Sequence, residues 1–328
     1  MIKNLKLLCV LLLCAIVSVG CGGGQEKVVT LKLAHGLSPT HSVHLGLVRM
    51  DEELQRLSDG KMKLQIYPSA QLGSEGSCVE LLQIGSLDIT KVSAATLESF
   101  ADPFKVFGIP YIFHSKDHLY RVVDGEVGKQ ILDSTVPYLF KGIAYFDSGA
   151  RSFYTIKKQI NKPEDLRGLK IRVMKSPIAV EMMQSFGSSA TPIDWGELYT
   201  ALQSNVVDGS ENNTPSITTS FHHEVTNYYS QTEHIFSPDV IVISTKRWNS
   251  LSAQQQEWID EAAKLARMYQ RELWAEQENI SLDIMKKKGM EIVVPDKQPF
   301  IDCSEPMRRK YASDPKFKDI MEKIEALQ

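Results

Sequence analysis

The sequence predicts an α/β protein of two domains with a ligand cleft between them. The chain has 328 residues, more than one hydrophobic core usually organises, so two domains are expected. Short stretches with strand patterns alternate with stretches of helical spacing, which is typical of largely parallel sheets. Ligands of such sheets bind at the carboxyl ends of the strands. A hydrophobic content of 43% and a charged content of 23% are those of an ordinary globular protein.

The first residues have the pattern of an export signal. Lys3 and Lys6 precede an uncharged run that is too short to span a bilayer as a mature helix. The Ser-Val-Gly-Cys sequence that ends at Cys21 resembles a bacterial lipoprotein box, and the alternative is an ordinary signal peptide with a stray cysteine. We therefore expect a signal peptide over residues 1–20, a lipid anchor and tether over residues 21–28, and a location in the periplasm or cell envelope.

The charge and the cysteines limit the partners. Removal of Lys3 and Lys6 leaves 35 basic and 40 acidic residues, a net charge of −5, and nothing in this balance indicates nucleic-acid binding. Membrane contact is expected only through the lipid anchor, and we expect a monomer. Cys78 and Cys303 remain after the proposed lipid site, and the sequence leaves a disulfide and two free thiols equally open.

The first domain is expected to begin with a strand, a helix and a strand. Residues 29–35 and 61–67 alternate as strands, and residues 43–57 between them have the apolar spacing of a helix. A second helix is expected over residues 78–85 and a further strand over residues 87–92.

A second domain is expected to begin near Ser148. Residues 151–156 have a strand pattern, and residues 163–166 form a short turn of helix before the strand GLKIRVM, residues 168–174. Side chains alternate along a strand, so the basic side chains of GLKIRVM lie opposite its aliphatic ones. By itself this pattern favours a solvated strand face.

Further along, Asp194 and Glu197 have the spacing of a capping box at the start of a helix that is expected to end at Asn205. Residues 206–209 then read as a short buried strand that leads into the polar residues 210–213.

The longest predicted element is a helix over residues 252–288, capped by a serine and stopped by a glycine. At 1.5 Å per residue it would extend about 55 Å, so we expect it to span both domains. The expected domains are discontinuous and approximate: residues 29–148 plus 238–277, and residues 149–237 plus 278–328.

Catalytic motifs are missing from the sequence. It contains no G-x-S-x-G, P-loop, H-E-x-x-H or dinucleotide-binding glycine pattern. His41-x-x-His44 and His222-His223 lack a third ligand cluster for a metal. These observations favour a binding protein over an enzyme, with no cofactor and no metal site.

Three sequence blocks carry a family resemblance. The blocks GARSFYT (149–155), PEDLRGLKIRVMKSP (163–177) and TPIDWGELYTALQSNVVDGSENN (191–213) resemble the substrate-binding proteins of tripartite ATP-independent periplasmic (TRAP) transporters. The likeness extends over residues 29–318. It implies two α/β domains that close around a carboxylate ligand, with a long helix across both.

The resemblance also implies roles for particular residues. Arg172 matches the arginine that pairs with the ligand carboxylate, for which a guanidinium offers two parallel N–H donors; a structural ion pair is the alternative. Arg151 matches a second family arginine, which we expect nearer the rim, or else as a surface charge. Asn212 matches a family asparagine, and Glu211 can brace the site. Trp195 matches an aromatic position over the ligand, although it can instead be a core residue.

Four weaker candidates come from their positions in the sequence. His35 ends the first strand and Ser93 follows the strand at residues 87–92, so both are expected at carboxyl strand ends. Glu75 lies beside a Gly-Ser-Glu-Gly turn and can accept hydrogen bonds from sugar hydroxyls. All three can equally be loop or cap residues, and Asp239 is a weaker candidate still. Ser93 stands where sialic-acid binders of the family carry a glutamate, which argues against sialic acid.

Together these features predict a solute receptor that hands an organic acid to the small and large membrane subunits of a TRAP transporter. PIDWGELYTALQ, DGSENN and SPDVIVIST resemble the sugar-acid branch of the family. A hexuronate such as glucuronate or galacturonate, or an aldonate, is therefore expected. A C4-dicarboxylate receptor, a receptor that feeds a sensor kinase, and an envelope hydrolase remain as alternatives.

Overall fold

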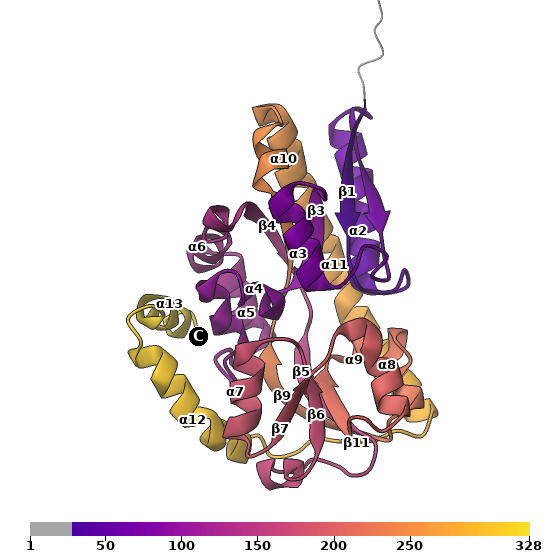
Figure 1. Ribbon diagram of the computed structural model, residues 1–328, viewed down its shortest axis with the longest axis vertical. Helices are drawn as coiled ribbons and strands as arrows, with labels where there is room; N and C mark the ends of the chain where they lie inside the picture. The colour runs from indigo at the N-terminus through magenta and orange to yellow at the C-terminus, as the bar shows by residue number, and fades with distance from the viewer. Residues whose placement is uncertain (1–27) are drawn as a thin grey trace, which may run out of the picture.

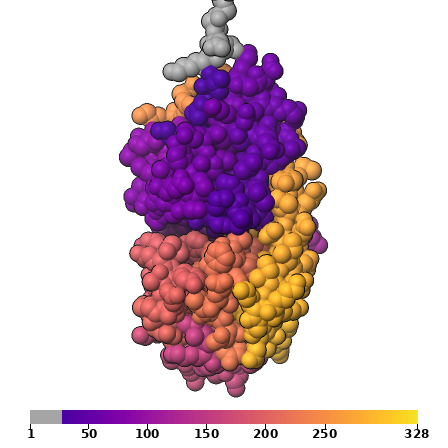
Figure 2. Space-filling view, turned by 90° about the vertical axis from the view of Figure 1, so that its right-hand side faces the viewer, coloured from indigo at the N-terminus to yellow at the C-terminus, as the bar shows by residue number. Residues whose placement is uncertain are grey.

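The structure of the protein is a computed structural model that describes residues 28–328, so the predicted signal peptide and the lipidation site Cys21 lie outside the described residues. The described chain forms two α/β units, each built on one sheet with helices packed against it (Figure 1). Figure 2 shows the first unit, in indigo and purple, meeting the second, in rose and orange, along a boundary across the molecule. The predicted fold class is confirmed.

The sheet of the first unit has the strand order β2-β1-β3-β10-β4. Strands β1, β2 and β3 are parallel, whereas β10 is antiparallel to both of its neighbours. The strands are β1 (Val29–Ala34), β2 (Met62–Tyr67), β3 (Ile89–Ser93), β4 (Phe140–Phe146) and β10 (Asp239–Ser244). In chain order, β10 comes after every strand of the second unit's sheet except β11 (Glu291–Val293). The chain therefore crosses back to the first unit to complete its sheet.

Helices pack on both faces of this sheet. The side chains of β10 alternate between the two faces of the sheet. Ile241 and Ile243 pack in one hydrophobic core with α2 and with α11 (Ala253–Lys287), and Val240 and Val242 pack in another with α3. The helices of this unit are α2 (Ser42–Leu57), α3 (Glu75–Ile84), α4 (Ala94–Leu97), η2 (Asp102–Gly108), α5 (Lys116–Val123), α6 (Glu126–Asp133), η3 (Val136–Tyr138) and α10 (Thr245–Asn249). Glu75 therefore lies in the first turn of α3, and the predicted turn at this position is wrong.

The sheet of the second unit has the order β11-β9-β5-β8-β6-β7. Its strands are β5 (Ala150–Thr155), β6 (Lys170–Val173), β7 (Ser189–Pro192), β8 (Gly209–Asn212), β9 (Tyr228–Phe236) and β11 (Glu291–Val293). Its helices are η4 (Pro163–Leu166), α7 (Pro177–Ser185), α8 (Trp195–Gln203), α9 (Thr214–Thr219), η5 (His222–Glu224) and α12 (Gln298–Ser313). β8 lies between β5 and β6, which brings the two arginine-bearing strands to either side of it.

Two local predictions in this unit are wrong. Val206 is 54% exposed, because Asn205 has a left-handed φ of 57° and turns the chain away after α8. The strand consequently begins at Gly209. Asp194 precedes α8, but its side chain accepts a hydrogen bond from Lys175 Nζ at 2.6 Å and makes no capping hydrogen bond to the helix.

Helix α11 (Ala253–Lys287) runs along both units, as predicted. Ile259 and Ala266 pack in the core of the first unit, and Met285 packs in the core of the second. The expected capping box is present, with Ser252 and Gln255 bonding each other's backbone N–H groups.

The last helix, α13 (Lys318–Glu325), contacts the first unit, where His118 Nε2 lies 2.8 Å from the carbonyl oxygen of Ile324. The assignment of the C-terminal residues to the second domain stays a prediction. Cys78 and Cys303 are both free, which resolves the alternative that the sequence left open.

Candidate functional site

A cavity of about 440 Å³ lies between the two units, lined by residues at or just after the carboxyl ends of β1, β3, β6, β7 and β8. Most of the side chains expected to bind ligand line it, namely Arg172, Arg151, Asn212, Trp195, Glu75 and Ser93. Asp239, the weakest candidate, also lines it. The sequence therefore located the cavity wall, and the structure shows how each side chain is held there.

Arg151 is enclosed by protein partners. It is 4% exposed, so its expected place near the rim is wrong. Its Nε and Nη2 donate to the two carboxylate oxygens of Glu211, Nη2 also donates to the Glu211 carbonyl oxygen at 2.8 Å, and Nη1 donates to Asn212 Oδ1 at 2.9 Å. Burial alone would raise the pKa of Glu211, but Arg151 and His234 lower it to about 2. Arg151 and Glu211 thus form a buried pair in which both charges are compensated.

Arg172 is buried without such a partner. It is 2% exposed; its Nε donates to the carbonyl oxygen of Ile193 at 2.9 Å, and its Nη1 makes no hydrogen bond. Burial is the largest influence on this group and lowers the pKa of the guanidinium. Among residues 28–328 no ion pair to Arg172 is present. The polar face of β6 therefore carries an uncompensated charge into the cavity rather than into solvent.

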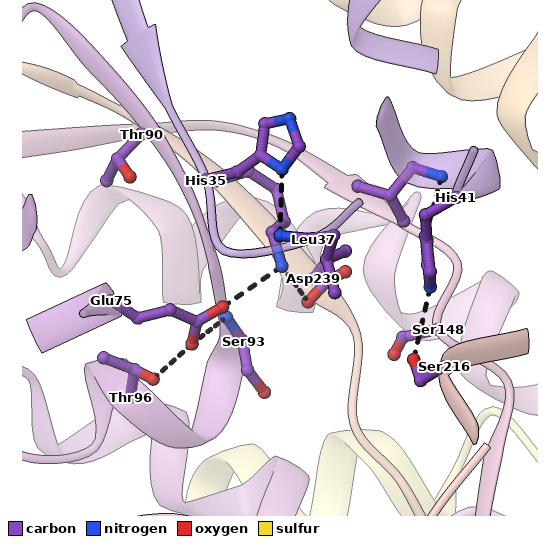
Figure 3. Close-up of polar contacts among 12 residues, drawn as sticks. His35, Leu37, His41, Glu75, Thr90, Ser93, Thr96, Ser148, Ser216 and Asp239 are labelled. Atoms are coloured by element: carbon purple, nitrogen blue, oxygen red, sulfur yellow. Dashed lines mark hydrogen bonds and ion pairs between the residues drawn. The ribbon is translucent and has the colours of Figure 1, made fainter. Parts of the chain in front are cut away.

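The wall of the first unit holds a lysine between two carboxylates. Lys91, on β3, is 2% exposed, and its Nζ lies 3.1 Å from Glu75 Oε1 and 3.3 Å from Asp239 Oδ1. Glu75 also accepts hydrogen bonds from Ser93 N and Thr96 Oγ1 at 3.0 and 2.7 Å (Figure 3). Burial lowers the pKa of Lys91, but the two carboxylates outweigh it and raise the pKa overall, so Lys91 stays charged.

Lys91 was not among the residues that the sequence predicted for the site. A lysine inside the short strand Ile89–Ser93, all of whose residues are buried, is a signal in itself, because a buried lysine requires acidic partners. The partners could not be identified, since Glu75 and Asp239 come from distant segments. The antiparallel register of β10 on β3, which opposes Asp239 to Ser93, brings Asp239 to this wall.

His35 lies behind the cavity wall rather than on it. Its Nδ1 accepts a hydrogen bond from the backbone N–H of Leu37 at 3.1 Å (Figure 3). Its Nε2 lies 2.9 Å from His44 Nδ1. Leu37 lines the cavity and His35 does not. Burial, with a smaller effect of Lys91, lowers the pKa of His35 to about 2, so the ring is neutral. The structure places His35 as a support for the loop after β1, and gives it no contact with the cavity.

The rim of the cavity carries an aromatic ring. Trp195 is half-buried at the start of α8, and the Arg172 guanidinium carbon lies 5.7 Å from the centroid of its ring. Lys175 and Asp194 form an ion pair of 2.6 Å beside it. Trp195 lines the cavity and also packs partly against the cores of both units, so its core alternative is met in part. Its place over a ligand stays a prediction.

A second, larger cavity of about 710 Å³ lies elsewhere between the units. Its lysines and arginine already have carboxylate partners: Lys116 contacts Glu278 at 2.6 Å, Lys297 contacts Glu233, and Arg308 contacts Glu305 at 2.7 Å. It offers no buried unpaired charge comparable with Arg172. The smaller cavity is therefore the candidate site.

The described part of the chain contains neither a candidate metal centre nor a helix that could span a membrane. No group of three or more His, Cys, Asp or Glu side chains within residues 28–328 could hold a metal ion. None of the helices in the same range has the length and apolar character needed to cross a membrane.

Comparisons with known proteins agree with this geometry. The family model described as "Bacterial extracellular solute-binding protein, family 7" matches residues 33–314. A TRAP periplasmic solute-binding protein from Anaerococcus prevotii, solved with bound D-glucuronate, is 37% identical, with 91% of this chain and 98% of that chain covered and a TM-score of 0.89. A second from Xanthobacter autotrophicus, solved with bound β-D-galacturonate, is 36% identical, with 91% and 100% covered and a TM-score of 0.88.

A curated relative is more distant but equally extensive. The 2,3-diketo-L-gulonate-binding periplasmic protein of Escherichia coli is 26% identical over 302 residues, 91% of this chain and 92% of that protein. The family match spans most of the chain, and the two solved receptors share its fold over nearly their full length. The resemblance inferred from the three sequence blocks is thereby confirmed. The chain belongs to family 7 of the bacterial extracellular solute-binding proteins, the solute receptors of TRAP transporters.

Proposed function

We propose that this receptor binds a hexuronate such as glucuronate or galacturonate, or a related sugar acid, with the ligand carboxylate on Arg172. The buried guanidinium of Arg172, with Nη1 unpaired, carries the proposal. A buried charge without a partner is costly, and a ligand carboxylate would compensate it through parallel N–H donors. The sugar acids bound to the two solved relatives support the same ligand class.

The other lining residues would bind the polyhydroxylated part of the ligand. Asn212 Oδ1 already accepts hydrogen bonds from Arg151 and from the backbone N–H of Asn213, so the side chain offers its N–H₂ group to a ligand oxygen. Glu75 and Asp239 are acceptors for hydroxyl groups. Trp195 presents a ring face suited to the C–H side of a pyranose.

In the cell the receptor would deliver its ligand to the small and large membrane subunits of the transporter, without catalysing a reaction. We propose that it acts as a monomer outside the cytoplasm, held to the membrane through lipid on Cys21. Labelling of the full-length protein with a fatty-acid analogue tests the anchor, and Cys21→Ser would abolish the label if it is correct.

A thermal-shift screen of organic acids tests the ligand class. Binding to the native state raises the melting temperature, so hexuronates and aldonates should give the largest shifts. Stabilisation by succinate, malate or fumarate alone would instead make the protein a C4-dicarboxylate receptor. Turnover of the bound acid would contradict the purely receptor role.

A further inference from the structure

The two walls of the candidate cavity carry opposite net charges. On the second unit, Arg151 is neutralised by Glu211, which leaves Arg172 as one uncompensated positive charge. On the first unit, the single ammonium of Lys91 faces two carboxylates, Glu75 and Asp239. Counted over these buried groups, the second wall has a net charge near +1 and the first wall a net charge near −1. Exposed Glu80 adds a further carboxylate to the first wall, and Lys175 and Asp194 cancel each other on the second.

The two carboxylates of the first wall lie mostly out of contact with solvent, so water does little to screen their excess negative charge. Asp239 is 5% exposed and the side chain of Glu75 is 24% exposed. Burial is the main reason that the pKa of Asp239 is raised, and the neighbouring charge of Glu75 adds to it despite Lys91. Glu75 also acts on Arg172 across the cavity, where it opposes the effect of burial on the guanidinium pKa. The two walls thus lie within electrostatic range of each other.

We propose that Glu75 and Asp239, held together on Lys91, make the cavity selective for monocarboxylate sugar acids over dicarboxylates of the same chain length. The inference rests on the proposed function, because it takes the ligand carboxylate to be on Arg172. The far end of a monocarboxylate carries hydroxyl groups, which donate hydrogen bonds to carboxylates. The far end of a dicarboxylate carries a second charge that cannot donate and is repelled.

The expected size of this discrimination follows from simple electrostatics. At an effective dielectric constant of about 20, two like charges about 7 Å apart repel enough to weaken binding tenfold or more. Specificity of this kind depends on a repulsive element against the wrong ligand as well as on contacts to the right one. Asp239 is the more buried of the two carboxylates and should therefore contribute more than Glu75.

Calorimetric titration with gluconate and glucarate tests the proposal. These six-carbon acids differ at one end, where gluconate has a hydroxymethyl group and glucarate a second carboxylate. Asp239→Asn removes one charge and keeps an amide oxygen for Lys91. We expect the affinity for glucarate, relative to gluconate, to rise about tenfold in this variant. Glu75→Gln should act in the same direction by a smaller factor.

The matched control is Asp283→Asn, which removes the same charge from an exposed position on α11 that does not line the cavity. It should leave the ratio of the two affinities unchanged. If both wall variants bind glucuronate but neither gains affinity for glucarate, the selectivity proposal is wrong and the proposed function stands. If the unmodified protein binds no sugar acid, the proposed function is wrong, and so is the selectivity inference that rests on it.

Discussion

Arg151 and Arg172 flank the same strand, β8, and differ in what surrounds their charges. Both are almost completely buried. Arg151 is bound by the carboxylate and the carbonyl of Glu211 and by Asn212, whereas Arg172 contacts one carbonyl oxygen and leaves Nη1 unpaired. The buried charge of Arg151 is therefore compensated within the fold, whereas that of Arg172 is not, and we propose that a ligand carboxylate compensates it.

The largest expected effect concerns stability at Arg151. Arg151→Met would leave Glu211 buried without its main partner, and breaking such a pair costs about 3–5 kcal/mol. Urea denaturation without ligand measures the loss. A change below about 1 kcal/mol would show that Glu211 finds another partner or takes up a proton, and the pair would then not be the structural element described above.

The second prediction concerns affinity at Arg172. Arg172→Lys keeps the charge but loses the two parallel N–H donors of the guanidinium. This loss should weaken sugar-acid binding by about 1.5–3 kcal/mol, or roughly ten- to a hundredfold. The free energy of unfolding without ligand should change little, because no protein carboxylate depends on Arg172.

Arg151→Lys is the matched control for that substitution. It should cost stability because Glu211 loses its bidentate partner, and it should cost less affinity than Arg172→Lys. Calorimetric titration of both variants decides the order. Equal losses, or a larger loss of affinity at Arg151, would mean that the ligand carboxylate has been assigned to the wrong arginine.

The third prediction uses acid to break the Arg151 pair. Glu211 has a folded pKa of about 2, below its usual 4.5. A depressed carboxyl pKa contributes stability that is fully present above about pH 4.5 and is lost as the pH falls towards 2. Glu211→Gln should therefore flatten the dependence of the urea midpoint on pH within this window. Parallel curves for the two proteins would contradict the assignment.

The smallest expected effect concerns the ring at the rim. Trp195→Leu keeps an apolar side chain at the start of α8 but removes the ring beside Arg172. Loss of a cation–π contact and of the sugar-stacking face should weaken binding by about 1 kcal/mol, or roughly fivefold. Titration with glucuronate measures it. An unchanged affinity would assign Trp195 to packing alone.

Part of the candidate site could be predicted from the sequence. The alternation in GLKIRVM put Arg172 on a polar strand face, and the family blocks singled out that arginine, Arg151 and Asn212. The buried pairing of Arg151 could not be predicted, because it depends on how β5 pairs with β8. That pairing sets Ser152 opposite Asn212 and Phe153 opposite Glu211. His35 directly follows β1, one residue beyond the end of the strand, and its hydrogen bond from the backbone N–H of Leu37 holds its ring behind the cavity wall.

The sequence by itself determined the two α/β units, the long helix across them and the family, because periodicity, caps and motif blocks are properties of short segments. The tertiary structure decided which charges are paired. Lys91 and Asp239 are separated by 148 positions and meet only through the register of β3 and β10. Alternation fixes which side chains share a face, whereas burial and ion pairing depend on what distant segment covers that face.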